Sequence, residues 1–378
     1  MVRYRCRIAY DGTSFSGFQL QGGRVESNKD DDHVNVNDNG RDNGNGNDKS
    51  GKSSAHKPRN PIHKHKHERN KPPPRTIQGE LERVLSKRFR RVVKVVGAGR
   101  TDGGVHARGQ AIHFDLYPNE TLVERGTQES SPNENDNEND KGQTIFEHQL
   151  EHMLNRMLPE DMCAWNLGRT VPTVVEGNVG GTIPPGIYNW NAMRTSTSKL
   201  YSYRISVGDA MDPSERHHRW QLPWHSIDPR RLERVLKSFE GTHDFVCFAG
   251  ALEQNKKKTG VTMGTVRTIH RIELVRESDA GKRRADHRNT ENTSWGRDLL
   301  DDCYRIDIYL DGALYKMVRN IVGTAVDVCR EWIDEEWMED LLERPGELGY
   351  SRRDNPCMPA PPNGLTLERV FYPDDDAF

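Results

Sequence analysis

Apolar and charged residues alternate at the start of the chain. Val2, Tyr4, Cys6, Ile8 and Tyr10 share one side of this run, and arginines separate the first four of them. Successive side chains of a strand point to opposite faces, so a period of two predicts a strand. Alternation or short apolar runs predict further strands at residues 92–97, 110–116, 199–207, 265–275 and 303–312.

Between these strands, apolar residues recur at helical spacing. Ile77, Leu81, Val84 and Leu85 predict a helix over residues 76–89. Further helices are expected at residues 146–158, 228–241 with Asp228 as the N-cap, and 314–332.

The strands and helices form two similar series, each of the split βαβ kind. We therefore expect an α/β fold of the α+β type, with two ferredoxin-like (RRM-like) halves. Their sheets should join in one curved antiparallel sheet with helices on its outer face. The N-terminal half would comprise residues 1–21 and 76–185, and the C-terminal half residues 186–378.

Three segments, at 22–75, 118–144 and 276–297, are poor in large apolar residues. Such segments bury too little surface to offset the entropy lost on ordering. We therefore expect disordered insertions. Loop closure becomes only slightly more costly with length, so a fold tolerates them. The remaining sequence has a normal apolar content and is long enough for two domains.

Charge and cysteine usage narrow the class of protein. The formal net charge of -2 excludes a uniformly basic binder but permits a local basic groove. The six cysteines are widely spaced and include no CxxC pair, so neither a zinc ribbon nor a disulfide framework is expected. No apolar run has membrane-spanning length, and the N-terminus does not resemble a leader. We expect an intracellular protein, in the cytoplasm or nucleus rather than an organelle, with no membrane partner.

The run GAGRTDGGVHARGQAIHFD, at 97–115, carries the most chemical information, because its glycines surround Arg100 and Asp102. Glycine lets backbone approach a ligand closely, and the flanking strands would hold such a loop rigidly. A tight connection in which Asp102 caps its own turn is an equally good interpretation. A phosphate-binding loop is excluded, because GxGxxG is absent and no Lys-Ser or Lys-Thr follows.

The segment GRTDGGVHARGQ, residues 99–110, closely resembles the signature of the TruA family of tRNA pseudouridine synthases. Other segments resemble that family and follow in its order. They are RIAYDGTSFSGFQLQ, TIQGELERVL, KLYSYRI, GTHDFVCFAG, TVRTIHRIEL, GALYKMVRNIVG and APPNGLTLERVFY. The resemblance spans nearly the whole chain outside the three polar segments.

The resemblance implies an isomerase that converts uridine to pseudouridine in tRNA, at positions 38–40 of the anticodon stem-loop. The reaction breaks the bond between ribose C1′ and uracil N1, turns the base and rejoins it through C5, without a cofactor or a metal. The family also implies a homodimer that binds tRNA with both subunits. Alternatives are the same chemistry at another tRNA position or on another RNA, and a catalytically silent RNA-binding homologue. A hydrolase using Asp102 and His106 would lack a second carboxylate or a metal set.

The same resemblance assigns the site. Asp102 would be the catalytic carboxylate, acting as nucleophile or as base toward the ribose, and Arg319 would stabilise its charge. By itself Arg319 could be a surface residue, but a lone arginine in an apolar stretch favours a buried pair. Tyr201 would stack on the uracil while its hydroxyl reaches the C5 proton. Strand packing is the simpler role, which we assign to Tyr203.

Other positions concern the RNA. Arg100 would fill the gap left by the flipped nucleotide and recover part of the few kcal/mol that flipping costs. Phe18 stands where the family usually has Trp. Met193 stands where the family often has a basic residue, and Arg194 beside it could replace that RNA contact. His106 and Arg108 would order the loop or touch phosphate.

The histidines of HKHKH, His63, His65 and His67, are expected to belong to a solvated linker rather than to a functional metal site. The basic run around them could add phosphate affinity or serve as a nuclear signal.

Overall fold

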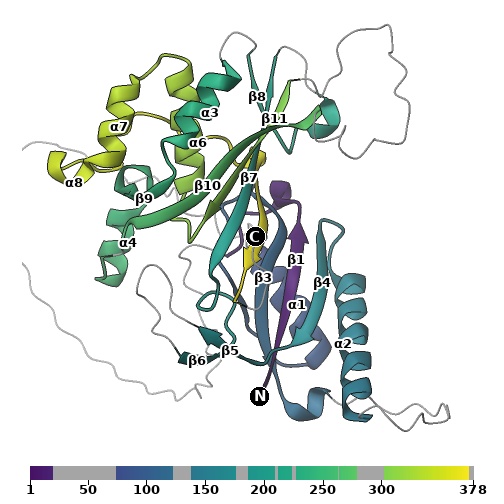
Figure 1. The fold of residues 1–378 in the computed structure, drawn as a ribbon. Helices are drawn as coiled ribbons and strands as arrows, with labels where there is room; N and C mark the ends of the chain where they lie inside the picture. The colour runs from purple at the N-terminus through teal and green to yellow at the C-terminus, as the bar shows by residue number, and fades with distance from the viewer. Residues whose placement is uncertain are drawn as a thin grey trace, which may run out of the picture. The chain divides into compact units, whose positions relative to one another are not determined.

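One sheet of ten strands joins the beginning, the middle and the end of the chain (Figure 1). Eight of its strands follow the order β4-β1-β3-β12-β7-β11-β10-β9, while β2 pairs with β3 and β8 pairs with β7. The strands are β1 Val2–Tyr10, β2 Val95–Gly97, β3 His106–Leu116, β4 Met162–Arg169, β7 Ser198–Val207, β8 Trp220–Leu222, β9 Gly241–Asp244, β10 Val266–Arg276, β11 Cys303–Leu310 and β12 Leu365–Phe371. A separate hairpin pairs β5 Pro172–Val175 with β6 Gly186–Asn189.

This computed structural model describes residues 1–19, 74–121, 138–175, 186–208, 212–223, 227–262, 264–278 and 302–373. The contacts reported below belong to one compact unit, Met1–Leu20 with Arg75–Phe378. The histidines of HKHKH and most of the segments predicted to be disordered lie outside the described residues.

Seven α-helices accompany the sheet in the described part of the chain. They are α1 Ile77–Phe89, α2 Glu138–Met157, α3 Pro229–Lys237, α4 Leu252–Thr259, α6 Met317–Cys329, α7 Glu335–Glu343 and α8 Pro345–Leu348. The predicted helical spacing is confirmed for α1, which buries all four of its expected apolar residues. The predicted N-terminal ends of α1 and α3 are also confirmed. Thr76 and Asp228 accept N-cap hydrogen bonds from the backbone N–H groups of Gly79 and Arg230. None of the helices in the described residues is long and apolar enough to cross a bilayer.

The sheet is mostly antiparallel, as expected for an α+β fold. Two pairings are parallel, β12 with β3 and β8 with β7. The pairing of β12 with β3 joins the N-terminal series of strands to the C-terminal series. Thr366 and Leu367 of β12 face His106 and Ala107 of β3, while the other edge of β12 runs antiparallel to β7. The C-terminal strand therefore sets β3 and β7 on either side of itself.

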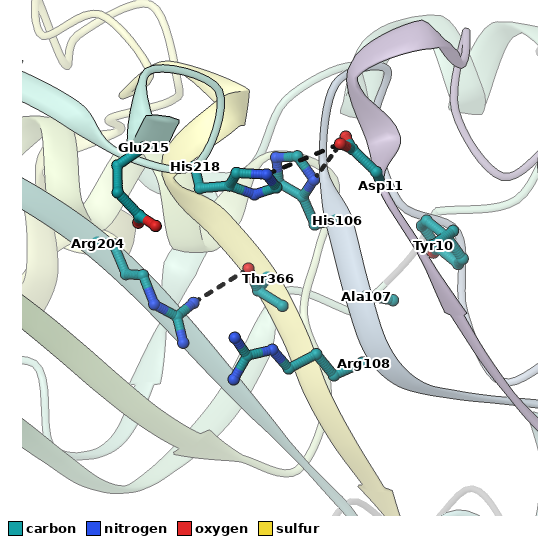
Figure 2. A pocket seen from close by; sticks show the side chains of 9 residues that line it. All are labelled: Tyr10, Asp11, His106, Ala107, Arg108, Arg204, Glu215, His218 and Thr366. Atoms are coloured by element: carbon teal, nitrogen blue, oxygen red, sulfur yellow. Dashed lines mark hydrogen bonds and ion pairs between the residues drawn. The ribbon is translucent and has the colours of Figure 1, made fainter. Parts of the chain in front are cut away.

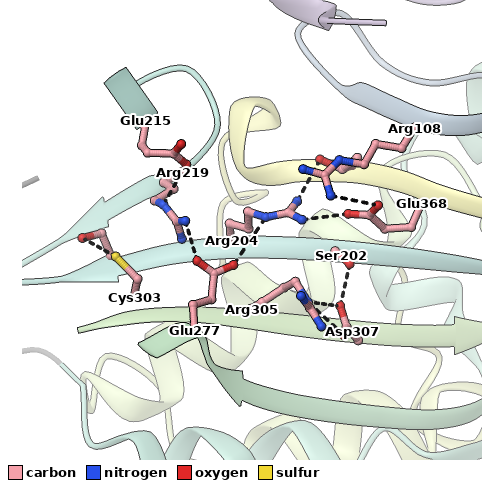
Figure 3. Close-up of polar contacts among 12 residues, drawn as sticks. Arg108, Ser202, Arg204, Glu215, Arg219, Glu277, Cys303, Arg305, Asp307 and Glu368 are labelled. Carbon is pink, nitrogen blue, oxygen red and sulfur yellow. Dashed lines mark hydrogen bonds and ion pairs between the residues drawn. The ribbon is translucent and has the colours of Figure 1, made fainter. Parts of the chain in front are cut away.

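A group of partly buried ion pairs, the Arg204–Glu277 network, ties β12 and β7 to the residues around them (Figure 3). Arg204 of β7 donates to Glu368 Oε1 of β12 at 2.9 Å and lies 3.5 Å from Glu277 Oε1. Glu277 also accepts from Arg219, which in turn donates to Glu215 Oε2 at 3.1 Å. Each carboxylate of Glu277 and Glu368 thus faces arginine, which offsets the cost of burying the charges.

The ends of the polar segments depart from the prediction of disorder. Residues 118–121 form a 3₁₀ helix, and the backbone of α2 begins at Glu138, within the predicted insertion. At the end of the first segment, Arg75 donates to both oxygens of Asp161 at 2.7 and 2.8 Å. Glu277 of the third segment joins the Arg204–Glu277 network. Low apolar content predicts few buried side chains, but it does not prevent helical hydrogen bonding or ion pairing.

Candidate active site

Asp102 lies in the loop between β2 and β3, and residues 15–18 hold this loop in place. The N–H of Phe18 donates to the carbonyl of Thr101 at 3.1 Å. Gly17 has φ +107°, and a Cβ there would lie only 2.9 Å from the same oxygen, so the close approach requires glycine. The Phe18 ring packs against Gly97, where a Cβ would lie 2.4 Å from the ring. Phenylalanine therefore supports the loop from the position where the family usually has tryptophan.

The structure brings Asp102 and Arg319 together from opposite ends of the chain. Arg319 Nη1 donates to Asp102 Oδ2 at 2.7 Å, and its Nε donates to the carbonyl of Ala360 at 2.7 Å. The backbone N–H of Ala360 returns a hydrogen bond to the Arg319 carbonyl at 2.9 Å. The two side chains keep 11% and 15% exposure. Arg319 is thus fixed at two points, while Asp102 remains accessible.

Three tyrosines surround this pair. Tyr201 of β7 is 7% exposed, and burial raises the pKa of its hydroxyl, with Tyr10 and the Asp102 carboxylate adding to the rise. Burial also raises the pKa of Tyr10 to about 12, and its hydroxyl lies 2.8 Å from Thr101 Oγ1. Burial, then the charge of Asp102, raises the pKa of Tyr315. All three phenols are therefore neutral near pH 7.

Lys199 contacts the same loop from β7. It stands two residues before Tyr201, so both side chains share one face of the strand. Its Nζ donates to the carbonyl of Ala98 at 3.1 Å. Desolvation, then the positive charge of Arg267, lowers the pKa of Lys199 to about 8, although Asp311 opposes the change. The amino group of Lys199, a weaker base than that of an ordinary lysine, is thus held at the loop that carries Asp102.

The two arginines predicted to bind RNA lie at exposed positions. Arg100 is exposed on the loop two residues before Asp102, and no other described residue forms a hydrogen bond or ion pair with its guanidinium. Arg194 is exposed in the turn before β7, where only its backbone N–H is engaged, by Asn191 Oδ1 at 3.0 Å. No hydrogen bond or ion pair within the described residues joins Arg194 to Asp102, Tyr201 or Arg319.

Burial raises the pKa of Tyr203 well above its usual value, and the charge of nearby Arg319 acts in the opposite direction. The Tyr203 hydroxyl donates to the carbonyl of Pro361 at 2.8 Å, and its ring is fully buried. This arrangement is what strand packing requires.

Sequence reasoning missed three of the residues around Asp102. Tyr10 was counted as a core position of β1, Tyr315 was not considered, and Lys199 was passed over within the aromatic segment. A signal existed for Lys199, because a lysine in an otherwise apolar and aromatic strand is costly to bury unless it has a partner. Alternation places Tyr10 on the buried face of β1 but does not identify its neighbours, and Tyr315 lies outside the strands, between β11 and α6.

Among the described residues, one group could hold a metal ion, formed by Asp11, His106 and His218. It lies where β1 ends and β3 begins, at the end of the loop that follows Asp102.

Comparison with known proteins adds a second line of evidence. A family profile described as tRNA pseudouridine synthase matches residues 235–373, which include Arg319. The protein named tRNA pseudouridine synthase A of Leuconostoc citreum is 29% identical over 383 residues, which cover 100% of both chains. Proteins of the same name from Latilactobacillus sakei and Geobacillus are 26% and 25% identical over 371 residues, which cover 98% of each chain. Over nearly its whole length the chain is therefore similar to proteins named tRNA pseudouridine synthase A, and its C-terminal part matches the tRNA pseudouridine synthase profile.

Proposed function

We propose that this protein isomerises uridine to pseudouridine in tRNA, at positions 38–40 of the anticodon stem-loop. The observation that carries the proposal is how the carboxylate of Asp102 is bound. Arg319 binds one of its oxygens, and no other hydrogen bond reaches its carboxylate from the described residues. A carboxylate that pairs with a fixed cation and still has a free oxygen can react with a ribose.

The ion pair supports either role proposed for Asp102. As nucleophile, the carboxylate would attack C1′ while uracil N1 leaves; as base, it would remove a proton from the ribose. Both roles require the charged form, which a cation at hydrogen-bond distance favours. Because Arg319 is already fixed by Ala360, it stabilises this charge without moving when the substrate binds.

Tyr201 supports the proposed turn of the base. Its phenol is neutral at pH 7, so the ring can lie against uracil without bringing a second negative charge beside Asp102. Once C5 has joined C1′, the C5 proton must leave and N1 must gain a proton. A hydroxyl can serve this transfer, because it accepts through a lone pair and donates its own hydrogen.

Arg100 supports extraction of the target nucleotide. Its guanidinium is exposed on the loop that carries Asp102, so it can occupy the space that the flipped uridine leaves. Arg194 remains a candidate for phosphate contact, in place of a basic residue at Met193.

We also infer two ferredoxin-like halves. In the N-terminal half the strands follow the order β4-β1-β3-β2, and in the C-terminal half the corresponding order is β12-β7-β11-β10. Helices stand between equivalent strands, with α1 and α2 in the first half and α3 and α6 in the second. Both halves therefore have the 4-1-3-2 order of a split βαβ unit. We further propose a homodimer, which the mass of the purified protein in solution tests.

The test of function is turnover on defined RNA. Purified protein is incubated with tRNA transcripts that carry uridine at positions 38–40, and pseudouridine is mapped at each position. The expected result is conversion within this stretch by the wild type and none by Asp102→Asn. Conversion elsewhere would support the chemistry and reject the position. Binding without conversion would identify a silent RNA-binding homologue.

A further inference from the structure

The end of β1, the start of β3 and the loop before β8 bring two imidazoles and a carboxylate together (Figure 2). His106 Nδ1 lies 3.2 Å from Asp11 Oδ1, and His218 Nε2 lies 3.7 Å from Asp11 Oδ2. The two imidazole rings lie 4.4 Å apart between centroids. Figure 2 shows Asp11 facing both histidines at the rim of a cavity. These are the ligand types that Zn²⁺ prefers.

The separations fit a shared metal ion. Ligand atoms that each lie about 2.1 Å from a tetrahedral centre are about 3.4 Å apart. The distance from His106 Nδ1 to Asp11 Oδ1 lies just below this value, and the distance from His218 Nε2 to the other oxygen, Oδ2, lies just above it. The three ligand atoms all fall within 4.8 Å of one another. Small rotations of the partly exposed Asp11 and His218 side chains would equalise the distances.

The hydrogen bonds around His106 select the tautomer that a metal requires. The N–H of Gly12 donates to Nδ1 at 3.1 Å, so Nδ1 carries a lone pair. Nε2 must then carry the hydrogen, which it donates to the carbonyl of His217 at 2.8 Å. Metal-binding histidines commonly donate their second ring N–H to a backbone carbonyl in this way.

Asp11 is oriented in a similar manner. Its Oδ1 accepts from the N–H of Thr13 at 2.9 Å and from Thr13 Oγ1 at 2.6 Å. These two hydrogen bonds leave Oδ2 turned toward His218. Burial differs among the three residues, because His106 keeps 5% side-chain exposure while Asp11 and His218 keep about 40%. The site is thus anchored on one side and open on the other.

From this arrangement we propose that Asp11, His106 and His218 form a binding site for a divalent transition metal of the Zn²⁺ class. Three protein ligands leave a fourth position for water, on the side of the cavity that Arg108, Glu215 and Thr366 also line. The metal ties the loop before β8 to β1 and β3, next to the loop that carries Asp102. Its role is to stabilise this junction.

A hydrogen bond from Gly12 limits the affinity of this site for a metal ion. The N–H of Gly12 occupies the lone pair of His106 that the metal uses, and Gly12 is buried. Displacing it leaves a buried donor to be satisfied again, which weakens binding by roughly tenfold to a hundredfold relative to a site with free ligands. Titrations therefore need to extend from micromolar to millimolar metal.

The test measures Co²⁺ binding to the full-length chain by its visible absorption, with competition by Zn²⁺. All proteins carry His63→Ala, His65→Ala and His67→Ala, so that HKHKH does not contribute. We expect one Co²⁺ per chain, displaced by Zn²⁺, and at least about tenfold weaker binding in His218→Ala and in Asp11→Asn. The matched control is His217→Ala, which removes the neighbouring exposed imidazole but keeps the carbonyl that binds His106.

Thermal unfolding supplies a second measurement. At the same Zn²⁺ concentration, the melting temperature of the parent and of His217→Ala should rise more than that of His218→Ala, because a ligand that binds the folded state stabilises it more the more tightly it binds. Absence of binding in the parent, or equal binding in His217→Ala and His218→Ala, would overturn the proposal. Neither measurement uses RNA, so their outcome is independent of pseudouridine formation.

Discussion

The Asp102–Arg319 pair and the Arg204–Glu277 network both place arginine beside a carboxylate inside the sheet region, but they differ in how fully the charges are matched. Glu277 faces two arginines, and Arg204 faces both Glu277 and Glu368 (Figure 3). Asp102 has a single partner within the described residues. Close by, Lys199 hydrogen-bonds only to a carbonyl, and it has no ion pair among those residues.

This difference separates a structural arrangement from a reactive one. A carboxylate whose oxygens are both paired with arginines has no capacity left for a substrate, so removing it chiefly affects stability. A carboxylate held by one arginine keeps an oxygen for reaction. Proteins commonly retain such incompletely matched groups at active sites at some cost in stability. The comparison therefore predicts that substitutions in the two regions affect different quantities.

The largest effect is expected for Asp102→Asn. The change keeps the shape of the side chain but removes its charge, so turnover should fall at least about a thousandfold. Stability should change little, because Arg319 keeps its hydrogen bond to Ala360. Asp115→Asn is the matched control, since Asp115 also pairs with one arginine, Arg3 at 2.7 Å, outside the site. Pseudouridine formation near the wild-type rate by Asp102→Asn would show that Asp102 is not catalytic.

In the Arg204–Glu277 network, Glu277→Gln should lower the free energy of unfolding by about 3–5 kcal/mol, because two buried arginines lose their shared carboxylate. Urea unfolding measures the change. Turnover by the protein that remains folded at low temperature should match the wild type. A large loss of turnover without a loss of stability would abolish the distinction between the two regions.

Arg319→Met should reduce turnover by roughly a hundredfold to a thousandfold, as expected when one fixed electrostatic contact is removed. Arg319→Lys keeps the charge but cannot bind Asp102 and Ala360 through one planar group. Its turnover should therefore lie between that of the wild type and that of Arg319→Met. Turnover by Arg319→Met close to the wild-type rate would separate Arg319 from catalysis.

The smallest effect concerns Lys199. Lys199→Met should raise the free energy of unfolding by about 1 kcal/mol at pH 7, because it removes a charge that burial disfavours. The folded protein releases this proton at about pH 8, below the ordinary lysine pKa of 10.5. Above pH 8 the unfolded chain therefore binds more protons, and the wild type gains stability as pH rises. The advantage of Lys199→Met should be full below pH 8 and shrink toward about pH 10.5, as urea unfolding across this range would show. A gain that does not depend on pH would have another cause.

Much of the fold could be predicted from periodicity. The alternation of β1 and the apolar stripe of α1 have the burial that the sequence indicates. Strand β4 was missed, because exposed residues interrupt its alternation and Trp165 is 43% exposed. The ends of the polar segments were also missed, since Arg75 and Glu277 are ordered by partners distant in the sequence.

The sequence by itself determined the faces of the main strands and helices, the glycine-rich loop around Asp102 and, through resemblance, the residues to examine there. Only the tertiary structure decided which residues meet. Asp102 lies 217 positions from Arg319, and β12 reaches β3 from the far end of the chain. Asp11, His106 and His218 come from three separate elements. Periodicity indicates which side of a helix or strand is buried. Which residue of a distant segment it contacts depends on how all the elements pack, because a long-range contact forms only when the sheet holds both segments in place.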